Sequence, residues 1–132
     1  MKLAARTPSI LIIDDDLGFV FWLGQLFNEI GYRTIPALNP KDALALAGDL
    51  NRGVDLLVAN PGLRGTAGLI RILSRVKRPK IILIVDAAAT VNPRLRGDAI
   101  LDRPSGWGPV SQPEWRQKIS RILTDIGIRA AS

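Results

Sequence analysis

The sequence predicts an α/β fold in which five parallel strands form a doubly wound sheet. Three short runs, at residues 10–13, 54–59 and 81–85, are apolar almost throughout, which is typical of strands buried on both faces. Strand-like and helix-like segments alternate about five times with short connections. This alternation favours a parallel sheet with helices on both of its faces.

The first predicted strand, residues 10–13, runs directly into three carboxylates, Asp14, Asp15 and Asp16. In an open α/β sheet the ligand crevice lies outside the carboxyl ends of the strands. Carboxylates this close together repel one another, so the cluster requires a neighbouring cation, which can be a metal ion, a Lys or an Arg. The sequence therefore predicts an acidic pocket at this edge of the sheet.

The next segments read as helix, strand and helix. Residues 17–30 carry apolar side chains at helical spacing and are followed by a glycine, which favours a helix stop. A short second strand is expected over residues 32–35. The second helix begins at Asn39 and Pro40, a capping residue followed by a proline at the first helical position, and extends to about residue 47.

The third predicted strand, residues 54–59, is broken by the sequence Asn-Pro-Gly at 60–62, because Pro lacks an N–H and Gly allows positive φ. A helix is expected over residues 69–76, which carry apolar side chains on one face. The run at 81–85 is the fourth strand.

The last part of the chain departs from the regular alternation of strands and helices. Pro93 makes any fourth helix short or absent. A brief fifth strand is expected at residues 99–101, and residues 103–113 are rich in turn formers. The final amphipathic helix is expected over residues 114–126, with Trp115 on its inward face.

Composition bounds the class of protein. The 132 residues suffice for a single domain, residues 1–132, and a hydrophobic content of 47% is ordinary for a globular chain. The sequence has no Cys and no His, which excludes thiolate chemistry, a disulfide framework and the usual general base. No apolar run approaches the roughly 20 residues of a membrane span, and no signal peptide precedes the first strand, so we expect a cytoplasmic protein.

The formal net charge is +6, from 18 basic and 12 acidic residues. Solvated helix faces account for this excess most simply, an acidic protein partner is the next interpretation, and direct binding of nucleic acid comes last because it requires basic residues clustered with aromatic ones. The basic residues gather in two groups: Arg71, Arg75, Lys77, Arg78 and Lys80, then Arg116, Lys118, Arg121 and Arg129.

Polar residues follow several of the predicted strands: the acids at 14–16, Asn60, Asp86, and Arg103 with its following proline. The arrangement resembles the receiver domain of bacterial response regulators, a flavodoxin-like (βα)5 fold. The resemblance covers nearly the whole chain. It is carried by the first strand with its acids and by the segments GYRTIPALNPKDALALA and VDLLVANPGLRGTAGL.

The resemblance implies that residue 60 occupies the phosphoacceptor position, which is an Asp in the family and is Asn60 here. A carboxylate attacks phosphorus as an anion, and a neutral amide cannot form an acyl phosphate. Deamidation through a succinimide needs the N–H of the next residue, and Pro61 has none. Asn60 is therefore a degenerate phosphoacceptor position.

Two switch positions also depart from the family. The Ser or Thr at the end of the fourth strand is replaced by Asp86, and the Lys that precedes a Pro is replaced by Arg103. The acidic pair, Asp14 and Asp15, is kept and leaves weak Mg²⁺ binding as the only expected metal interaction. We expect the Arg103 guanidinium to pair with Asp15 or Asp86 and to supply the positive charge that the pocket needs.

These departures predict a pseudo-receiver: a phosphorylation-independent receiver domain that acts as a protein–protein interaction module in two-component-type signalling, without catalysis or cofactor. Its protein partner is not identified by the sequence, no membrane contact is expected, and the oligomeric state is left open. A shortened fourth helix would alter the family's common output and dimerisation surface. Trp107 is a candidate anchor for the partner, since aromatic residues are enriched at binding hot spots, whereas Trp115 is expected to pack the last helix.

The alternative function is a small α/β nucleotide-binding or enzymatic domain that uses the crevice at the strand ends. The sequence lacks GxGxxG and Walker A motifs, and no Ser has a His to activate it. The glycines at 62 and 65 are too few to cradle a diphosphate.

Overall fold

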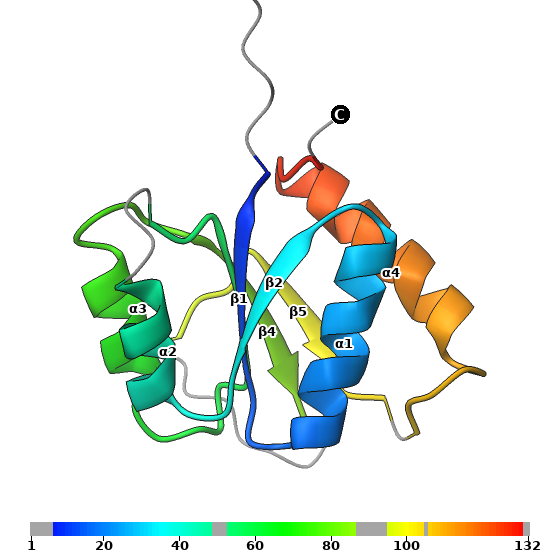
Figure 1. Cartoon of the computed structure of the whole chain (residues 1–132), viewed down its shortest axis with the longest axis horizontal. Helices are drawn as coiled ribbons and strands as arrows, with labels where there is room; N and C mark the ends of the chain where they lie inside the picture. Colours follow the sequence, from blue (N-terminus) through cyan, green and yellow to red (C-terminus); the bar gives the residue numbers. More distant parts are fainter. Residues whose placement is uncertain (1–6, 49–52, 87–94, 105, 131–132) are drawn as a thin grey trace, which may run out of the picture.

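The computed structural model describes residues 7–48, 53–86, 95–104 and 106–130. Five parallel strands form one sheet in the order β2-β1-β3-β4-β5 (Figure 1). This confirms the predicted flavodoxin-like α/β architecture. The strands are β1 (Ser9–Ile13), β2 (Arg33–Ala37), β3 (Leu56–Ala59), β4 (Lys80–Val85) and β5 (Ala99–Asp102).

Helices cover both faces of the sheet (Figure 1). One hydrophobic cluster packs α1 and α4 on the first face around Phe19, Trp115 and Ile119, and a second packs α2 and α3 on the opposite face around Ala43 and Leu69. Burying both faces stabilises the central strands, as their continuous apolar sequences require. The helices are α1 (Leu17–Glu29), α2 (Pro40–Ala47), α3 (Thr66–Leu73) and α4 (Gln112–Asp125).

Strand β2 is longer than the predicted 32–35, because it continues through Pro36 to Ala37. A proline is tolerated here because β2 is an edge strand. The carbonyl of Ala37 accepts a hydrogen bond from the N–H of Asp14 at 3.2 Å, so Ala37 faces β1 and Pro36, one residue earlier, faces outward. The missing N–H of Pro36 therefore costs no hydrogen bond within the sheet.

Helix α3 lies three residues earlier than the predicted 69–76. It begins after Gly65, whose φ of 94° is in the left-handed region that favours glycine. The hydroxyl of Thr66 donates to the carbonyl of Leu63 at 2.9 Å and fixes the first turn. Val76, predicted to lie on the buried face, is 69% exposed beyond the end of the helix.

The expected short or missing fourth helix falls largely on residues 87–94, which lie outside the described residues. The described residues that lead into β5, 95–98, are not helical. They are held by Asp98, whose carboxylate accepts the N–H of Ile81 at 2.8 Å. Of the helices in the described parts of the chain, none is long and apolar enough to cross a bilayer.

The turn-rich segment after β5 packs against α1. The indole N–H of Trp22 donates to the carbonyl of Gly108 at 3.2 Å, and the ring of Trp107 lies 6.4 Å from that of Phe19. Gly18 permits this approach, because a Cβ at that position would lie 2.4 Å from Cη2 of Trp107. The segment therefore has a defined position beside the carboxyl end of the sheet.

Candidate functional site

The polar residues predicted at the strand ends lie next to one another in the sheet. The register pairs Ile13 with Ala59, and the N–H of Asn60 donates to the carbonyl of Ile13 at 3.1 Å. At the other side of β4, the N–H of Arg103 donates to the carbonyl of Val85 at 2.8 Å. The parallel ladders thus continue past the strands and bring Asp14, Asn60, Asp86 and Arg103 to one edge.

Asp14 is the buried acid of this edge, with 1% of its surface exposed. One carboxylate oxygen accepts the N–H of Asp16 at 2.9 Å, and the other accepts a hydrogen bond from Nη2 of Arg103. Burial raises the pKa of Asp14 above its ordinary value, although the Asp16 N–H and the Arg103 guanidinium act in the opposite direction. Both oxygens of this carboxylate are therefore already used within the protein.

The Arg103 side chain bridges two carboxylates and an aromatic ring. Besides the bond to Asp14, its Nε donates to Oδ1 of Asp86 at 2.7 Å, and its Cζ lies 4.5 Å from the centroid of the Phe19 ring. Burial alone would lower the pKa of Arg103, but the two carboxylates outweigh burial and the pKa is raised. The side chain is only 16% exposed, so the guanidinium stays charged in a largely dry environment.

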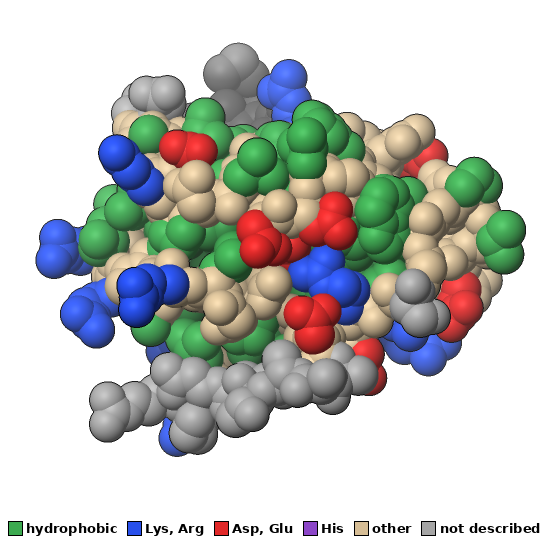
Figure 2. Space-filling model, turned by 90° about the horizontal axis from the view of Figure 1, so that it is seen from below, with side chains coloured by type: hydrophobic (Ala, Val, Ile, Leu, Met, Phe, Trp, Pro, Cys, Tyr) green, Lys and Arg blue, Asp and Glu red, His purple; other side chains and the backbone are tan. Residues whose placement is uncertain are grey.

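Acidic side chains surround a basic one near the middle of the face seen in Figure 2, which looks onto the carboxyl ends of the strands. We call the ion-paired residues Asp14, Asp86 and Arg103 the arginine clamp. The expected pairing of Arg103 with Asp86 is present. The alternative partner, Asp15, was the wrong choice. Arg103 pairs with Asp14 instead, and Asp15 is exposed.

The preference for Asp14 over Asp15 follows from the alternation of side chains along an extended strand. Ile10 and Ile12 point to the sheet face that packs against α1 and α4, and Asp14 continues this series. Leu101 points to the same face two residues before Arg103. Asp14 and Arg103 therefore meet on one face of the sheet, beside the Phe19 ring.

Asn60 lies beside the clamp and is engaged in the local turn. It is 9% exposed, and its Oδ1 accepts the N–H of Gly62 at 2.8 Å, while its carbonyl accepts the Thr66 hydroxyl at 3.2 Å. This is a side-chain turn of the kind that Asn and Asp both form. The side-chain oxygen of residue 60 is thus engaged by the loop that leads into α3.

Phe19 is a contributor to the site that sequence reasoning treated only as part of a buried helix stripe. It is fully buried, and its ring contacts Trp22, Trp107 and Trp115 at centroid distances of 6.0 to 6.4 Å. Trp107, a candidate partner anchor in the sequence, packs on this cluster and stays 39% exposed. Trp115 packs the last helix, as expected, and is 4% exposed.

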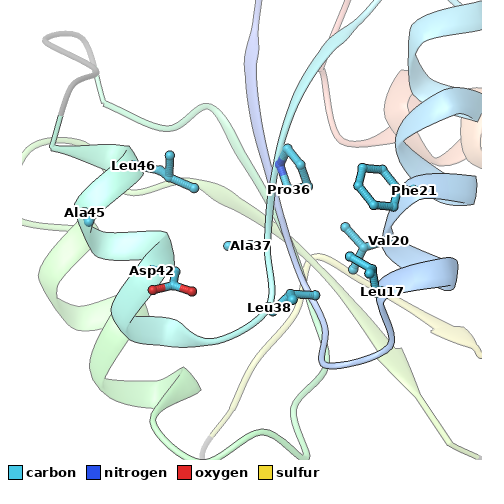
Figure 3. A pocket seen from close by; sticks show the side chains of 9 residues that line it. All are labelled: Leu17, Val20, Phe21, Pro36, Ala37, Leu38, Asp42, Ala45 and Leu46. Carbon is cyan, nitrogen blue, oxygen red and sulfur yellow. The ribbon is translucent and has the colours of Figure 1, made fainter.

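A separate apolar groove lies between α1, β2 and α2 (Figure 3). Phe21 and Leu17, which line it, are 61% and 52% exposed, and Asp42 is the only charged residue among the described residues that line it. Exposed apolar side chains gathered in this way are common at protein interaction surfaces. The groove does not include the arginine clamp, so the two features are distinct.

Comparison with known proteins shows the fold. No family model matches the sequence, and no curated protein matches it. A CheY-like receiver domain from Methanospirillum hungatei superposes with a TM-score of 0.67 at 20% identity, covering 91% of this chain and 96% of that chain.

Two further structures have the same architecture. The signal receiver domain of an HD domain-containing protein from Pseudomonas fluorescens gives a TM-score of 0.64 at 22% identity, covering 95% of this chain and 93% of that one. The chemotaxis response regulator CheY4 of Vibrio cholerae gives 0.63 at 16% identity, covering 89% of this chain and all of that one. At these identities the likeness shows that the chain has the receiver-domain fold, and function has to be argued from the site.

Proposed function

We propose that this chain is a phosphorylation-independent receiver domain that acts as a protein–protein interaction module in signalling of the two-component type. The observation that carries the proposal is the arginine clamp, in which the Arg103 guanidinium pairs with Asp14 and Asp86 at the carboxyl end of the sheet. The proposal assigns the chain no catalytic activity.

The chemistry of residue 60 and of the adjacent clamp supports this function. Asn60 provides a neutral amide where the receiver resemblance calls for an attacking carboxylate, so no acyl phosphate can form there. Asp86 would repel an incoming phosphoryl group, whereas Arg103 already supplies the positive charge that the buried Asp14 needs. We infer that the clamp holds the edge in one state and that signalling depends on binding alone.

Exposed surface features support contact with another protein. Leu17 and Phe21 are more than half exposed in the apolar groove beside the edge strand β2. Trp107 stays partly exposed next to the clamp. Large apolar side chains exposed at the surface favour contact with another protein.

The donor set fits Mg²⁺ poorly. Both oxygens of Asp14 already accept hydrogen bonds, the guanidinium of Arg103 lies against them, and no group of three or more potential ligating side chains was found among the described residues. We expect Mg²⁺ to bind weakly at Asp14 and Asp15, and Arg103→Ala to strengthen this binding by about tenfold, since one close positive charge is removed. NMR titration of the Asp15 and Asn60 amides with Mg²⁺ measures both affinities, with equal ionic strength from NaCl as control.

Phosphoryl transfer provides the direct test of the proposed function. Incubation with acetyl phosphate and Mg²⁺, followed by intact mass measurement, is expected to leave the mass of this chain unchanged. A receiver that carries the phosphoacceptor Asp is treated in parallel and is expected to gain one phosphoryl group. The same gain by this chain would overturn the proposal that it works without phosphorylation.

A further inference from the structure

Basic residues from two distant parts of the sequence meet at the amino-terminal edge of the sheet. Lys77, Arg78 and Lys80 lie at the connection from α3 into β4, and Arg129 follows α4; all four line one hollow. Figure 1 shows the start of β1 and the end of α4 together at the upper edge of the molecule. The two basic groups of the sequence therefore contribute to one surface.

A second hollow continues this surface. Arg71, Arg78 and Arg96 line it, so Arg78 belongs to both hollows. Partly exposed aliphatic side chains also line the hollows: Ile128 in the first, and Ile70 and Leu95 in the second. The basic surface, as we call it, consists of Arg71, Lys77, Arg78, Lys80, Arg96 and Arg129.

The charge of this surface is largely uncompensated. Lys77 pairs with Asp55 at 2.5 Å, and the same carboxylate accepts the N–H of Ser9 at 2.7 Å. Among the residues that the structure describes, none of the other five cations has a carboxylate within ion-pair distance. All six are exposed, so a partner can reach them without any change in the fold.

We propose that the basic surface binds an acidic polypeptide segment that also carries aliphatic side chains. Four of the six cations are Arg, whose planar fork of donors matches carboxylates. The aliphatic lining of the hollows offers apolar contact to a peptide, and no described residue that lines either hollow is aromatic, so the bases of a single-stranded nucleic acid would find nothing to stack on. The surface thus provides both charge complementarity and apolar contact.

This inference deepens the proposed function by naming the chemistry of the partner. It is physically independent of the arginine clamp, because the clamp lies at the carboxyl ends of the parallel strands and the basic surface lies at their beginnings. Phosphorylation of the chain would therefore overturn the proposed function and leave peptide binding intact. Failure of peptide binding would overturn this inference and leave the proposed function intact.

Fluorescence anisotropy with a labelled peptide of Glu-Glu-Leu repeats tests the inference. The matched probes are a Gln-Gln-Leu peptide and a labelled DNA duplex. The triple variant Arg78→Glu/Lys80→Glu/Arg129→Glu removes the surface charge, and Arg33→Glu/Lys41→Glu/Arg121→Glu makes the same change in net charge at exposed positions outside both hollows. Circular dichroism establishes that both variants are folded.

We expect the Glu peptide to bind wild type at least about tenfold more tightly than the Gln peptide, and binding to weaken with salt. The surface variant should lose about tenfold or more in affinity, and the control variant less than about threefold. Equal losses in the two variants would assign the attraction to net charge and overturn the proposal. Equal affinity for the Glu and Gln peptides, or tighter binding of the duplex than of the Glu peptide, would also overturn it.

Discussion

Replacing Arg103 by Ala is expected to lower the free energy of unfolding by about 3 kcal/mol at neutral pH, because it leaves the buried Asp14 carboxylate without a cation. The change also removes the contact of the guanidinium with the Phe19 ring and the bond to Asp86. Urea denaturation followed by far-ultraviolet circular dichroism measures the difference. The size of this difference in unfolding free energy distinguishes a clamp that stabilises the edge of the sheet from an ordinary surface ion pair.

Arg116→Ala is the matched control. Arg116 pairs with Glu29 at 2.6 Å, but both side chains are at least one-third exposed, so its loss should cost at most about 1 kcal/mol and should depend on salt. Equal effects of the two substitutions would mean that the clamp contributes no more than a surface ion pair.

The cost of Arg103→Ala should also depend on pH. Without the guanidinium, burial raises the pKa of Asp14 in the folded variant still further above its unfolded value. A carboxyl whose folded pKa is raised stabilises the fold below the unfolded pKa, and this contribution is lost as pH rises through the folded pKa. The difference from wild type is therefore largest at neutral pH and shrinks towards about pH 4. A difference that is constant over this range would exclude Asp14 as its source.

Replacing Phe19 by Ala is expected to destabilise the fold by about 4 kcal/mol, since the ring is fully buried among three tryptophans. It also leaves a cavity beneath the Arg103 guanidinium, so the indole of Trp107 loses its packing partner. The expected readouts are a lower denaturation midpoint and a red-shifted tryptophan emission in the folded protein.

The neighbouring residue Phe21 provides the control on the same helix. It is 61% exposed in the apolar groove, so Phe21→Ala should cost less than about 1 kcal/mol and leave the emission unchanged. If the two substitutions had the same effect, Phe19 would have no special role beneath the clamp.

The alternation of side chains along the strands made much of the site accessible from the sequence. Leu101 and Arg103 belong to one face, as do Ile12 and Asp14, so a strict period of two selects Asp14 over Asp15 as the Arg103 partner. The expectation of Asp15 or Asp86 as the partner did not apply this rule. The choice of Asn60 came from the receiver-domain resemblance, and the structure places its backbone at the end of β3, where its N–H donates to the carbonyl of Ile13.

Features that depend on three-dimensional packing were not accessible in the same way. The Phe19 ring meets Arg103 only through the packing of α1 on the sheet, and no local pattern encodes that meeting because the two residues are far apart in the sequence. The displaced start of α3 has a local cause, since Gly65 in the left-handed region and the Thr66 hydroxyl begin the helix before the apolar stripe does. The hollow shared by Lys77 and Arg129 requires the tertiary fold, because these residues are far apart in the sequence.

Pro36 has a consequence for assembly. Within β2 the backbone of Thr34 and of Pro36 is directed to solvent, and of these two only Thr34 has an N–H. A further strand that paired with β2 would receive a hydrogen bond from the N–H of Thr34 but none from Pro36. Growth of the sheet through this edge is therefore disfavoured, and association at the neighbouring groove has to depend on side chains.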